Sequence, residues 1–343
     1  MSPMPTMRAI QLQEYGGPEV LKVVDTSTPE PGPGQITVDV AYTGVNFADL
    51  KARGEGYRVP SLPYVPGLEV SGHVRALGAG VEGFEVGQEV AALTDGGAYA
   101  EVALADATTV FALPDGVDLR TAATLPTVLP TAHALLHEVG RLRAGESVLV
   151  QGAAGGIGTV VGQLAKAGGA GAVYGVVSSE AKAKYALEHG YDEVFVGGSG
   201  DSGDSARSGD GFAAEVRAAT GGRGVDLALD PVGGDVFRGG LAALAVFGRL
   251  VSFGNASSAP PWQVGQPELY GTGLGVSGFS ILSLAKSAPD ALREVAARAF
   301  AKVADGTVRL PVTAEFPLAD AAEAHRLMGA RTSTGKLLLR VAG

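Results

Sequence analysis

Cysteine is absent from this chain of 343 residues. Its absence excludes disulfide bonds, thiol nucleophiles and zinc sites built on cysteine. Five histidines remain as candidate metal ligands, and two of them, His133 and His137, are four residues apart. The residues between them, Ala134-Leu135-Leu136, contain no glutamate of the His-Glu-x-x-His type. We therefore expect a packed helix here and no metal site.

The chain also lacks an excess of basic residues and any long apolar run. Its 26 lysines and arginines against 36 aspartates and glutamates give a formal net charge of −10, which disfavours nucleic acid as a partner. No apolar run approaches the roughly 18 residues of a membrane span, and no basic-then-apolar leader is found. We expect a cytoplasmic protein with small-molecule partners and no membrane association. A hydrophobic content of 46% over this length is enough for two domains.

Glycine, in contrast, is abundant, and the most informative of the 52 glycines lie between residues 152 and 158. The apolar run 147–151 is typical of a strand, the next residues of a tight turn, and 157–167 of an amphipathic helix. A turn of this kind aims backbone N–H groups and the positive end of a helix dipole at a phosphate. We expect a dinucleotide cofactor to be bound there by Gly152, Ala154, Gly155, Gly156, Ile157 and Gly158.

The end of the following strand, at 172–177, indicates which dinucleotide. An Asp or Glu at this position would bind the free ribose hydroxyl of NAD. Ser178, Ser179 and Lys182 follow instead, and hydroxyl and ammonium groups suit the 2′-phosphate of NADP. We predict NADPH as the cofactor. Ser179 could equally cap the next helix, and Glu180 could still reach a ribose.

Alternation of strands and helices from residue 147 onward predicts a doubly wound parallel sheet. We expect its strands at 147–151, 172–177, 193–196, 225–229 and 249–253, and its helices at 157–167, 180–189, 212–219 and 235–244. The Ser-, Gly- and Asp-rich stretch 197–211 is interpreted as a solvated loop without a site.

The remainder of the chain is predicted to form a second unit. Before residue 120, short strands separated by glycines indicate a β-rich, barrel-like fold. After residue 272 we expect a glycine-spaced apolar strand to about Leu282, a helix at 288–304 and a closing strand at 335–341. The predicted domains are a dinucleotide-binding domain at 128–282 and a β-rich domain formed by 1–127 and 283–343.

Five motifs stand in order along the chain. They are Gly44-Val45-Asn46-Phe47-Ala48-Asp49, Pro66-Gly67-Leu68-Glu69-Val70-Ser71-Gly72, Gly96-Gly97-Ala98-Tyr99-Ala100-Glu101, Ala153 to Gly158, and Gly335-Lys336-Leu337. Together they resemble the medium-chain dehydrogenase/reductase superfamily, and within it the zinc-free quinone oxidoreductase branch that includes ζ-crystallin. The resemblance runs from Met7 to Val341. It implies an α/β protein with a GroES-like catalytic domain and a Rossmann domain.

The resemblance also implies chemistry without zinc. Zinc-dependent members carry a cysteine in the first motif and a histidine in the second, whereas this chain has no cysteine and has Leu68 in the second motif. Zinc stabilises an alkoxide in alcohol oxidation, so its absence favours hydride transfer from NADPH to a quinone or an activated α,β-unsaturated carbonyl. The alternatives are reduction of an enoyl thioester, and a protein that binds or senses NADPH without turnover.

The same resemblance places Asn46 on the nicotinamide side of the site and Tyr57 near the hydride acceptor. Tyr57 could donate a proton or hydrogen-bond a developing enolate, so Asn46 and Tyr57 are the predicted catalytic residues. Thr131 is expected to offer its hydroxyl to the nicotinamide. Glu69 is interpreted as a structural acceptor for backbone N–H groups. Asp49 is expected to orient Asn46 or to cap the following helix.

Four further residues complete the predicted cofactor contacts. Gly254 and Asn255 follow the last predicted parallel strand, where the nicotinamide half of the cofactor should pass. Arg331 and Lys336 lie near the end of the chain, and in the family an arginine near Arg331 can approach the 2′-phosphate. We also expect a homodimer formed through the strand Leu274 to Leu282, because an exposed strand edge needs a partner.

Overall fold

The computed structural model describes residues 5–197 and 209–341. By its internal contacts the chain divides into two units. The first unit comprises Met1–Pro130, Ile281–Asp305 and Leu310–Gly343, and the second comprises Thr131–Ser280 and Gly306–Arg309. Most of the predicted loop at 197–211 lies outside the described residues. Each unit is described by itself below.

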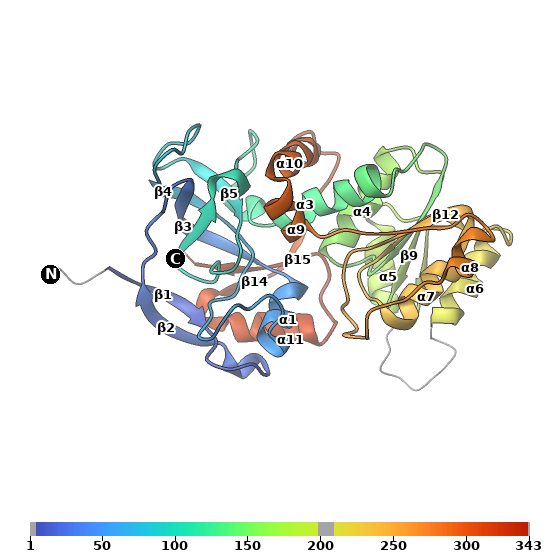
Figure 1. Cartoon of the computed structure of the whole chain (residues 1–343), viewed down its shortest axis with the longest axis horizontal. Coiled ribbons are helices and arrows are strands. Elements are labelled where there is room, and N and C mark those ends of the chain that lie inside the picture. The colour runs from blue at the N-terminus through green and yellow to red at the C-terminus, as the bar shows by residue number, and fades with distance from the viewer. Residues whose placement is uncertain (1–4, 198–208, 342–343) are drawn as a thin grey trace. The chain divides into compact units, whose positions relative to one another are not determined.

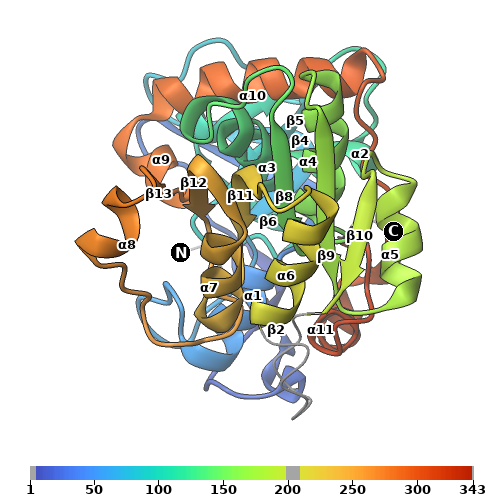
Figure 2. The ribbon, with the colours of Figure 1, turned by 90° about the vertical axis from the view of Figure 1, so that its right-hand side faces the viewer.

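The second unit contains a six-stranded parallel sheet. Its strand order is β10-β9-β8-β11-β12-β13, which Figure 2 displays from right to left. The strands are β8 (Ser147–Gln151), β9 (Ala172–Val177), β10 (Glu193–Val196), β11 (Val225–Asp230), β12 (Leu244–Ser252) and β13 (Gly275–Gly278). The chain thus proceeds outward from the central β8 in both directions, the order of dinucleotide-binding domains, and the predicted Rossmann fold is confirmed.

Helices connect these strands as crossovers. They are α4 (Gly156–Ala167), α5 (Glu180–Leu187), α6 (Gly209–Ala219) and α7 (Gly234–Ala242), with the short α8 (Gln266–Tyr270) before β13. Right-handed crossovers place α4 and α5 on one face of the sheet and α7 on the other, because the chain runs in opposite directions on the two sides of β8. A buried core beneath α6 and α7 includes Phe212, Phe237 and Leu250.

Two sequence-based boundaries in this unit were wrong. The strand expected to reach Leu282 ends at Gly278, and α9 (Ile281–Ser287) begins three residues later, with Leu282 buried as a helical residue. β12 begins at Leu244, whereas the sequence predicted a start at 249. Between these two residues the register of β12 against β11 shifts, and Phe247 adopts a φ of 62°. This irregularity interrupts the alternation from which a strand is predicted.

The first unit is β-rich, as predicted. Its main sheet has the order β14-β15-β3-β4-β5-β7, with β6 also paired to β3, and β1 and β2 form a separate antiparallel pair (Figure 1). The strands are β1 (Thr6–Gln11), β2 (Lys22–Ser27), β3 (Gln35–Val45), β4 (Glu69–Leu77), β5 (Glu89–Leu93), β6 (Val102–Asp106), β7 (Val110–Ala112), β14 (Val312–Pro317) and β15 (Lys336–Arg340). The long β3 pairs with three strands and shifts register twice against β4, which bends it as a barrel-like sheet requires.

Helices complete the first unit. They are α1 (Phe47–Glu55), α2 (Leu119–Ala122), α3 (Leu125–His133), α9, α10 (Pro289–Ala304) and α11 (Ala321–Gly329), and a π-helical turn (Ala134–Val139) continues α3 into the second unit. Single 3-10 turns occupy Pro18–Val20, Ala107–Thr109 and Leu318–Asp320. The sequence analysis gave no bounds for α1, and it missed β14 and α11. Figure 1 shows α1 and α11 side by side, in agreement with their contacts.

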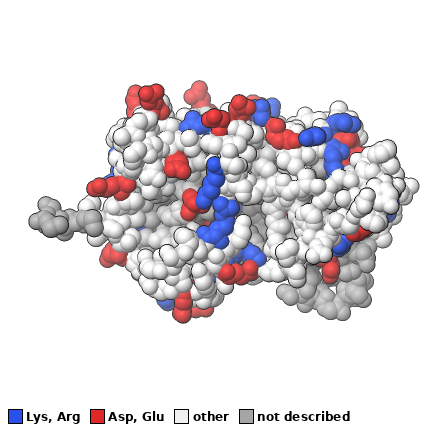
Figure 3. Space-filling view, in the orientation of Figure 1, with Lys and Arg blue, Asp and Glu red and all other residues white. Residues whose placement is uncertain are grey.

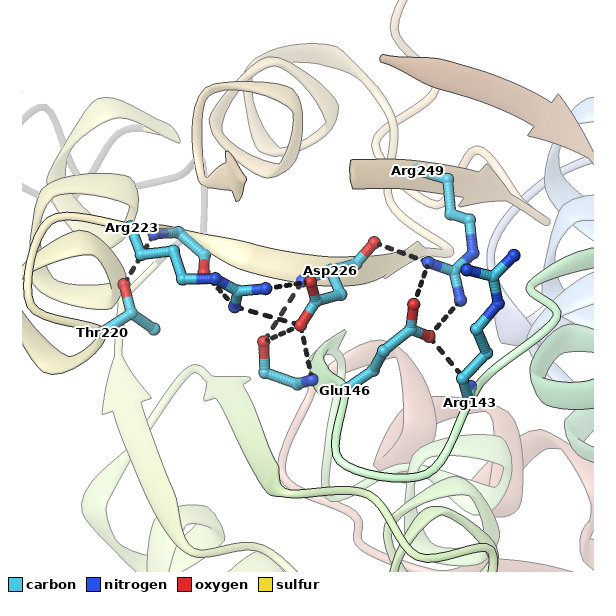
Figure 4. Close-up of polar contacts among 8 residues, drawn as sticks. Arg143, Glu146, Thr220, Arg223, Asp226 and Arg249 are labelled. Atoms are coloured by element: carbon cyan, nitrogen blue, oxygen red, sulfur yellow. Dashed lines mark hydrogen bonds and ion pairs between the residues drawn. The ribbon is translucent and has the colours of Figure 1, made fainter. Parts of the chain in front are cut away.

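A polar network lies at the amino ends of the parallel strands, around β11 (Figure 4). Arg249 donates both terminal nitrogens to the Glu146 carboxylate, at 3.1 and 2.5 Å, and also bonds the Asp226 carbonyl at 3.2 Å. Asp226 in turn accepts from the backbone and hydroxyl of Ser147, each at 2.8 Å, and pairs with Arg223. These contacts join the starts of β8 and β11 to Arg249 within β12, at the edge opposite the glycine-rich turn.

The described helices include none with both the length and the hydropathy of a membrane-spanning segment. On the face seen in Figure 3, most basic groups stand beside acidic ones. The ion pairs of the described residues include exposed ones, such as Arg75 with Asp39 and Lys286 with Asp95. Exposed pairs of this kind contribute little to stability.

Candidate active site

The glycine-rich turn after β8 forms an anion cradle. Gly152 adopts a φ of 69°, and the N–H groups of Gly152 and Ala153 donate to the Val176 carbonyl of β9 at 3.0 and 3.2 Å. A Cβ atom on Gly158 would collide with the Gly152 carbonyl and stand 2.7 Å from the backbone of Ala153, so only glycine fits. α4 begins at Gly156, and its first N–H groups have no intrahelical acceptor.

The predicted 2′-phosphate residues lie on the same edge of the sheet. β8 and β9 are parallel neighbours, so the turn at 152–158 and the end of β9 both lie at the carboxyl edge. Ser179 is the N-cap of α5, and its Oγ accepts from the Lys182 N–H at 3.4 Å. Ser178 is exposed. The capping role for Ser179 is thus confirmed, and Ser178 and Lys182 flank it.

The loop after β11 is a feature that the sequence analysis missed. Asp230 is completely buried and accepts from the N–H groups of Val232 and Gly233 at 2.9 and 3.1 Å, while burial raises its pKa to about 6. The intervening Pro231 lies 3.6 Å from where a Cβ of Gly152 would stand. The Asp-Pro-Val-Gly-Gly sequence directly after a predicted strand was the available signal for this turn.

Gly254 and Asn255 also lie at the carboxyl edge, just after β12. A Cβ on Gly254 would stand 2.6 Å from the Pro231 carbonyl, so this glycine lets two loops pack together. The Asn255 carboxamide bonds within its own loop, donating to the Ala259 carbonyl at 2.8 Å and accepting from Ser257 at 3.2 Å. The structure therefore gives Asn255 a local role and leaves its predicted cofactor contact open.

Thr131 on α3 carries a buried hydroxyl that has no hydrogen-bond partner among the described residues, and the residue is 4% exposed. The side-chain oxygen of Gln151, at the end of β8, is likewise buried without a partner, while its amide nitrogen donates to Val236. Buried polar atoms are paired in most native structures. Both atoms are therefore candidates for contacts that a ligand or a water would complete.

In the first unit, Asn46 lies against a buried ion pair. The Lys336 ammonium, 3% exposed, contacts the Glu69 carboxylate at 2.5 Å, and Glu69 is fully buried. The Asn46 carboxamide contacts both partners, because its nitrogen donates to Glu69 Oε1 at 2.8 Å and its oxygen accepts from Lys336 Nζ at 2.6 Å. Thr127 on α3 adds its hydroxyl to the same oxygen at 3.2 Å, and its N–H to Glu69 Oε2 at 2.9 Å.

The glycine of the first motif makes room for this arrangement. A Cβ on Gly44 would collide with Glu69 Oε1 and stand 2.8 Å from the backbone carbonyl of Ala123. The backbone carbonyl is fixed, so a side chain at residue 44 would displace the carboxylate. Glu69 does accept a backbone N–H, as the sequence analysis expected, but it also holds Lys336 and Asn46.

A second chain of hydrogen bonds begins at Asp49. Its carboxylate accepts from the Asn46 N–H at 2.8 Å and from the Tyr99 hydroxyl at 3.2 Å. His325 Nε2 lies 3.1 Å from that hydroxyl, and Arg53 lies 3.4 Å from His325 Nδ1. Burial raises the pKa of Asp49 to about 7 and lowers the pKa of His325 to about 3, so the histidine is neutral. A neutral imidazole that accepts at Nδ1 donates at Nε2. The hydrogen bonds therefore all point toward Asp49: Arg53 donates to His325, His325 to the Tyr99 hydroxyl, and Tyr99 to the Asp49 carboxylate.

Four of the five motifs therefore meet in one polar cluster, which we call the Asn46 cluster. It consists of Asn46, Asp49, Glu69, Tyr99, Thr127, His325 and Lys336. Thr127, His325 and the pairing of Lys336 with Glu69 were not anticipated. The lysine's proximity depends on β15 pairing with β3, a contact between residues almost 300 positions apart that no local pattern reveals.

Other predicted residues lie away from this cluster. Tyr57 is 45% exposed and follows the C-cap Gly56 of α1, whereas Asn46 precedes the same helix. A helix of nine residues is about 14 Å long, so the two predicted catalytic side chains are not neighbours along it. Arg331 is exposed, with a φ of 55°, after α11. Lys336 would have to leave its ion pair before it could bind a phosphate.

Comparison with known proteins agrees with this architecture. The model of the alcohol dehydrogenase GroES-like domain matches residues 32–115, and that of zinc-binding dehydrogenases matches residues 156–298. A quinone oxidoreductase of Pseudomonas aeruginosa is 36% identical over 97% of this chain and 99% of its own length. The crystal structure of Escherichia coli quinone oxidoreductase complexed with NADPH has a TM-score of 0.87 and 31% identity, covering 97% of this chain and all of the other.

A third similarity is to part of a larger protein. The chain is 31% identical, over 97% of its length, to 15% of a mycocerosic acid synthase-like polyketide synthase of Mycobacterium tuberculosis. From these matches, the chain belongs to the medium-chain dehydrogenase/reductase superfamily. Within that superfamily it belongs to the quinone oxidoreductase branch, as the five motifs predicted.

The raised pKa of Asp49 predicts a specific dependence of stability on pH. A folded-state pKa of about 7, against an ordinary value of 3.8, means that proton binding by Asp49 favours the folded state at low pH. This contribution to the free energy of unfolding declines as the pH rises above about 4, and it is lost once the pH exceeds about 7. Asp49→Asn lacks it, so the stability of the variant relative to the wild type should increase between pH 5 and pH 8 in urea unfolding. Asp39 is an exposed carboxylate on β3, and Asp39→Asn is therefore the control for the loss of one charge. A relative stability that stays level or falls over this range would contradict the assignment.

Proposed function

We propose that this protein is an NADPH-dependent reductase that transfers hydride to a quinone or an activated α,β-unsaturated carbonyl without zinc. The observation that carries the proposal is the carboxyl edge of the parallel sheet. There, the anion cradle at 152–158 lies next to a β9 end that bears Ser178, Ser179 and Lys182 and no carboxylate at the tip. The quinone oxidoreductase relatives, one of them complexed with NADPH, support the same cofactor and acceptor.

The residues of the second unit fit a dinucleotide phosphate. The tight turn at 152–158 leads into α4, whose first N–H groups, starting at Gly156, lack an intrahelical acceptor and are suited to the pyrophosphate. The unpartnered hydroxyl of Thr131 is suited to the nicotinamide carboxamide. Gly254, Asn255 and Arg331 remain predicted contacts. NADPH, when bound, supplies the hydride. The protein's part is to orient the cofactor, exclude water and stabilise the charge that develops on the acceptor.

Two residues of the first unit are proposed to act on the acceptor. The Asn46 N–H would hydrogen-bond a carbonyl oxygen, of either the cofactor or the acceptor. The Tyr57 hydroxyl, on the surface after α1, would donate a proton to the product or stabilise its oxygen.

The side chains available support the proposal of chemistry without zinc. Among residues 5–197 and 209–341, no group of three or more His, Asp or Glu side chains is arranged to hold a metal ion, and the chain has no cysteine. The glutamate of the second motif, Glu69, is already engaged by Lys336 and Asn46. A quinone or enone is electrophilic enough to accept hydride without a Lewis acid. A cytoplasmic location stays a prediction.

An enoyl thioester is the second candidate acceptor. The match of the whole chain to one segment of a polyketide synthase favours including it. Rates with 1,4-benzoquinone, cyclohex-2-enone and crotonyl-coenzyme A, each with NADPH, separate the three acceptors. NADPH binding without turnover of any of them would favour a sensing protein instead.

The cofactor preference is predicted to depend on the end of β9. Lys182→Ala and Ser178→Ala should each raise the dissociation constant for NADPH about tenfold or more, because each removes a hydrogen bond to the 2′-phosphate. NADH binding should not change, since NADH lacks this phosphate. Fluorescence titration measures both constants, and Lys184→Ala, on the same helix and exposed, is the matched control. Equal effects on NADPH and NADH would assign the two residues a structural role only.

Tyr57→Phe is predicted to lower kcat about a hundredfold with quinone or enone, because it removes the proton donor. The dissociation constant for NADPH should be unchanged. Tyr15→Phe is the matched control, since Tyr15 is also 45% exposed and packs beside Gly56 at the end of the same helix. Full turnover of Tyr57→Phe would remove this residue from the chemistry.

We further propose a homodimer formed through β13. This strand pairs only with β12 within the described sheet, and large apolar side chains are exposed around it, with Phe247 78%, Tyr270 69% and Val246 60% exposed. An open edge with apolar neighbours favours a second copy of the chain.

Sedimentation should give twice the 34.5 kDa chain mass. Phe247→Glu should dissociate the dimer. Val86 is an apolar residue of the first unit that is 67% exposed, and Val86→Glu should leave the dimer intact. A wild-type monomer at micromolar concentration would contradict the proposal.

A further inference from the structure

The carboxamide of Asn46 is held at both of its ends. Its oxygen accepts from Lys336 Nζ at 2.6 Å and from Thr127 Oγ1 at 3.2 Å, which uses both lone pairs. Its nitrogen donates one proton to Glu69 Oε1 at 2.8 Å. The second proton has only a long contact of 3.5 Å, to the Gly44 carbonyl. This N–H is the hydrogen-bonding capacity that the carboxamide retains.

The position of Asn46 makes this arrangement unusual. Asn46 is the N-cap of α1, where an asparagine oxygen ordinarily accepts from the first helical turn. Here Asn46 and Asp49 form a capping box in which the Asp49 N–H donates to the Asn46 backbone carbonyl at 3.0 Å, while the Asn46 side-chain oxygen accepts from Lys336 and Thr127. The Asp49 carboxylate in turn accepts the Asn46 backbone N–H at 2.8 Å, and the carboxamide turns toward Glu69 and Lys336. The carboxamide oxygen is therefore committed to Lys336 and Thr127, although the residue is only partly buried.

Stability alone does not account for the ion pair. Glu69 and Lys336 are 0% and 3% exposed, and burying two charges costs about as much as their attraction returns. A pair of apolar residues would fill the same volume at less cost. What the charges add is direction, since an ammonium attracts only the oxygen of the amide and a carboxylate attracts only its N–H groups.

We propose that Glu69 and Lys336 are positioning residues that fix the Asn46 carboxamide with its oxygen inward, so that Asn46 can serve a ligand only as an N–H donor. The chemical group it selects is a carbonyl oxygen or oxyanion. That oxygen belongs to the nicotinamide carboxamide or to the hydride acceptor. A hydroxyl or amine that needs an acceptor finds none on Asn46. The inference rests on the proposed function and specifies how the Asn46 cluster serves it.

A double-mutant cycle between residues 46 and 336 tests this coupling. The wild type, Asn46→Ala, Lys336→Met and the double variant are compared by two readouts. The first is the dissociation constant for NADPH, from fluorescence without acceptor, and the second is KM and kcat with 1,4-benzoquinone. Lys336→Met should impair either NADPH binding or quinone reduction at least tenfold. It should have no further effect when residue 46 is already Ala. A change in NADPH affinity identifies the carboxamide as the bound oxygen, and a change confined to KM or kcat identifies the acceptor.

Further variants separate positioning from general destabilisation. Lys336→Arg keeps the charge and should restore most of the loss. Arg249→Met removes a partly buried guanidinium in the second unit, with no contact to Asn46, and should lower the melting temperature without changing either ligand constant. If Lys336→Met does not fold, the double variant Glu69→Gln/Lys336→Met takes its place in the cycle, because it removes both buried charges together.

The outcomes are distinct. Additive effects of Asn46→Ala and Lys336→Met, ligand constants within twofold of wild type in folded Lys336→Met, or no rescue by Lys336→Arg would each overturn the positioning role while the proposed function stands. A wild-type protein that neither binds NADPH nor reduces quinone would overturn both.

Discussion

The ion pair between Glu69 and Lys336 is the constraint around which the first unit is arranged. It joins the start of β4 to the start of β15 and, through Asn46 and Thr127, to the starts of α1 and α3. Four segments distant in sequence thus share one buried charge pair. Charges in such a place are tolerated only when their remaining hydrogen-bonding capacity is used, and here the Thr127 N–H and the Asn46 carboxamide use it. Removing a single partner would leave an unpaired buried charge.

This constraint explains the motifs in physical terms. Residue 44 must be glycine because the Glu69 carboxylate occupies the space that a Cβ atom would need. Asp49 caps α1 because Asn46 is engaged elsewhere, and Tyr99 and His325 hydrogen-bond in turn toward Asp49. In the second unit the corresponding constraint is close backbone approach. Gly158 and Gly254 lie where a side chain would collide with a neighbouring carbonyl, which brings the loops after β8, β11 and β12 together at the carboxyl edge.

Local patterns were sufficient to predict the parallel sheet. Apolar runs, glycine turns and strand–helix alternation identified the strands from β8 to β12 and the cradle at 152–158, because each depends on residues close together in sequence. The same patterns failed where tertiary contacts decide. α1 begins at Phe47, where the Asp49 carboxylate accepts the N–H of the N-cap Asn46. The bulge at Phe247 hides the start of β12, and the strand expected to reach Leu282 gives way to a helix after Gly278. Of the Asn46 cluster, the sequence identified Asn46, Asp49, Glu69 and Lys336 separately. Their pairing required the register of β15 against β3.

The central claim is that a buried ion pair orients Asn46 as a hydrogen-bond donor in an NADPH-dependent reductase. A crystal structure of the wild-type protein with NADPH, at a resolution that separates amide nitrogen from oxygen, tests it most directly. We predict that NADPH lies on the cradle at 152–158 with its 2′-phosphate at Ser178 and Lys182. Lys336 should remain paired with Glu69, and the Asn46 oxygen should face Lys336 while its nitrogen faces the nicotinamide or the acceptor position. An Asn46 oxygen turned toward the ligand, or Lys336 withdrawn from Glu69 to bind a cofactor phosphate, would contradict the account.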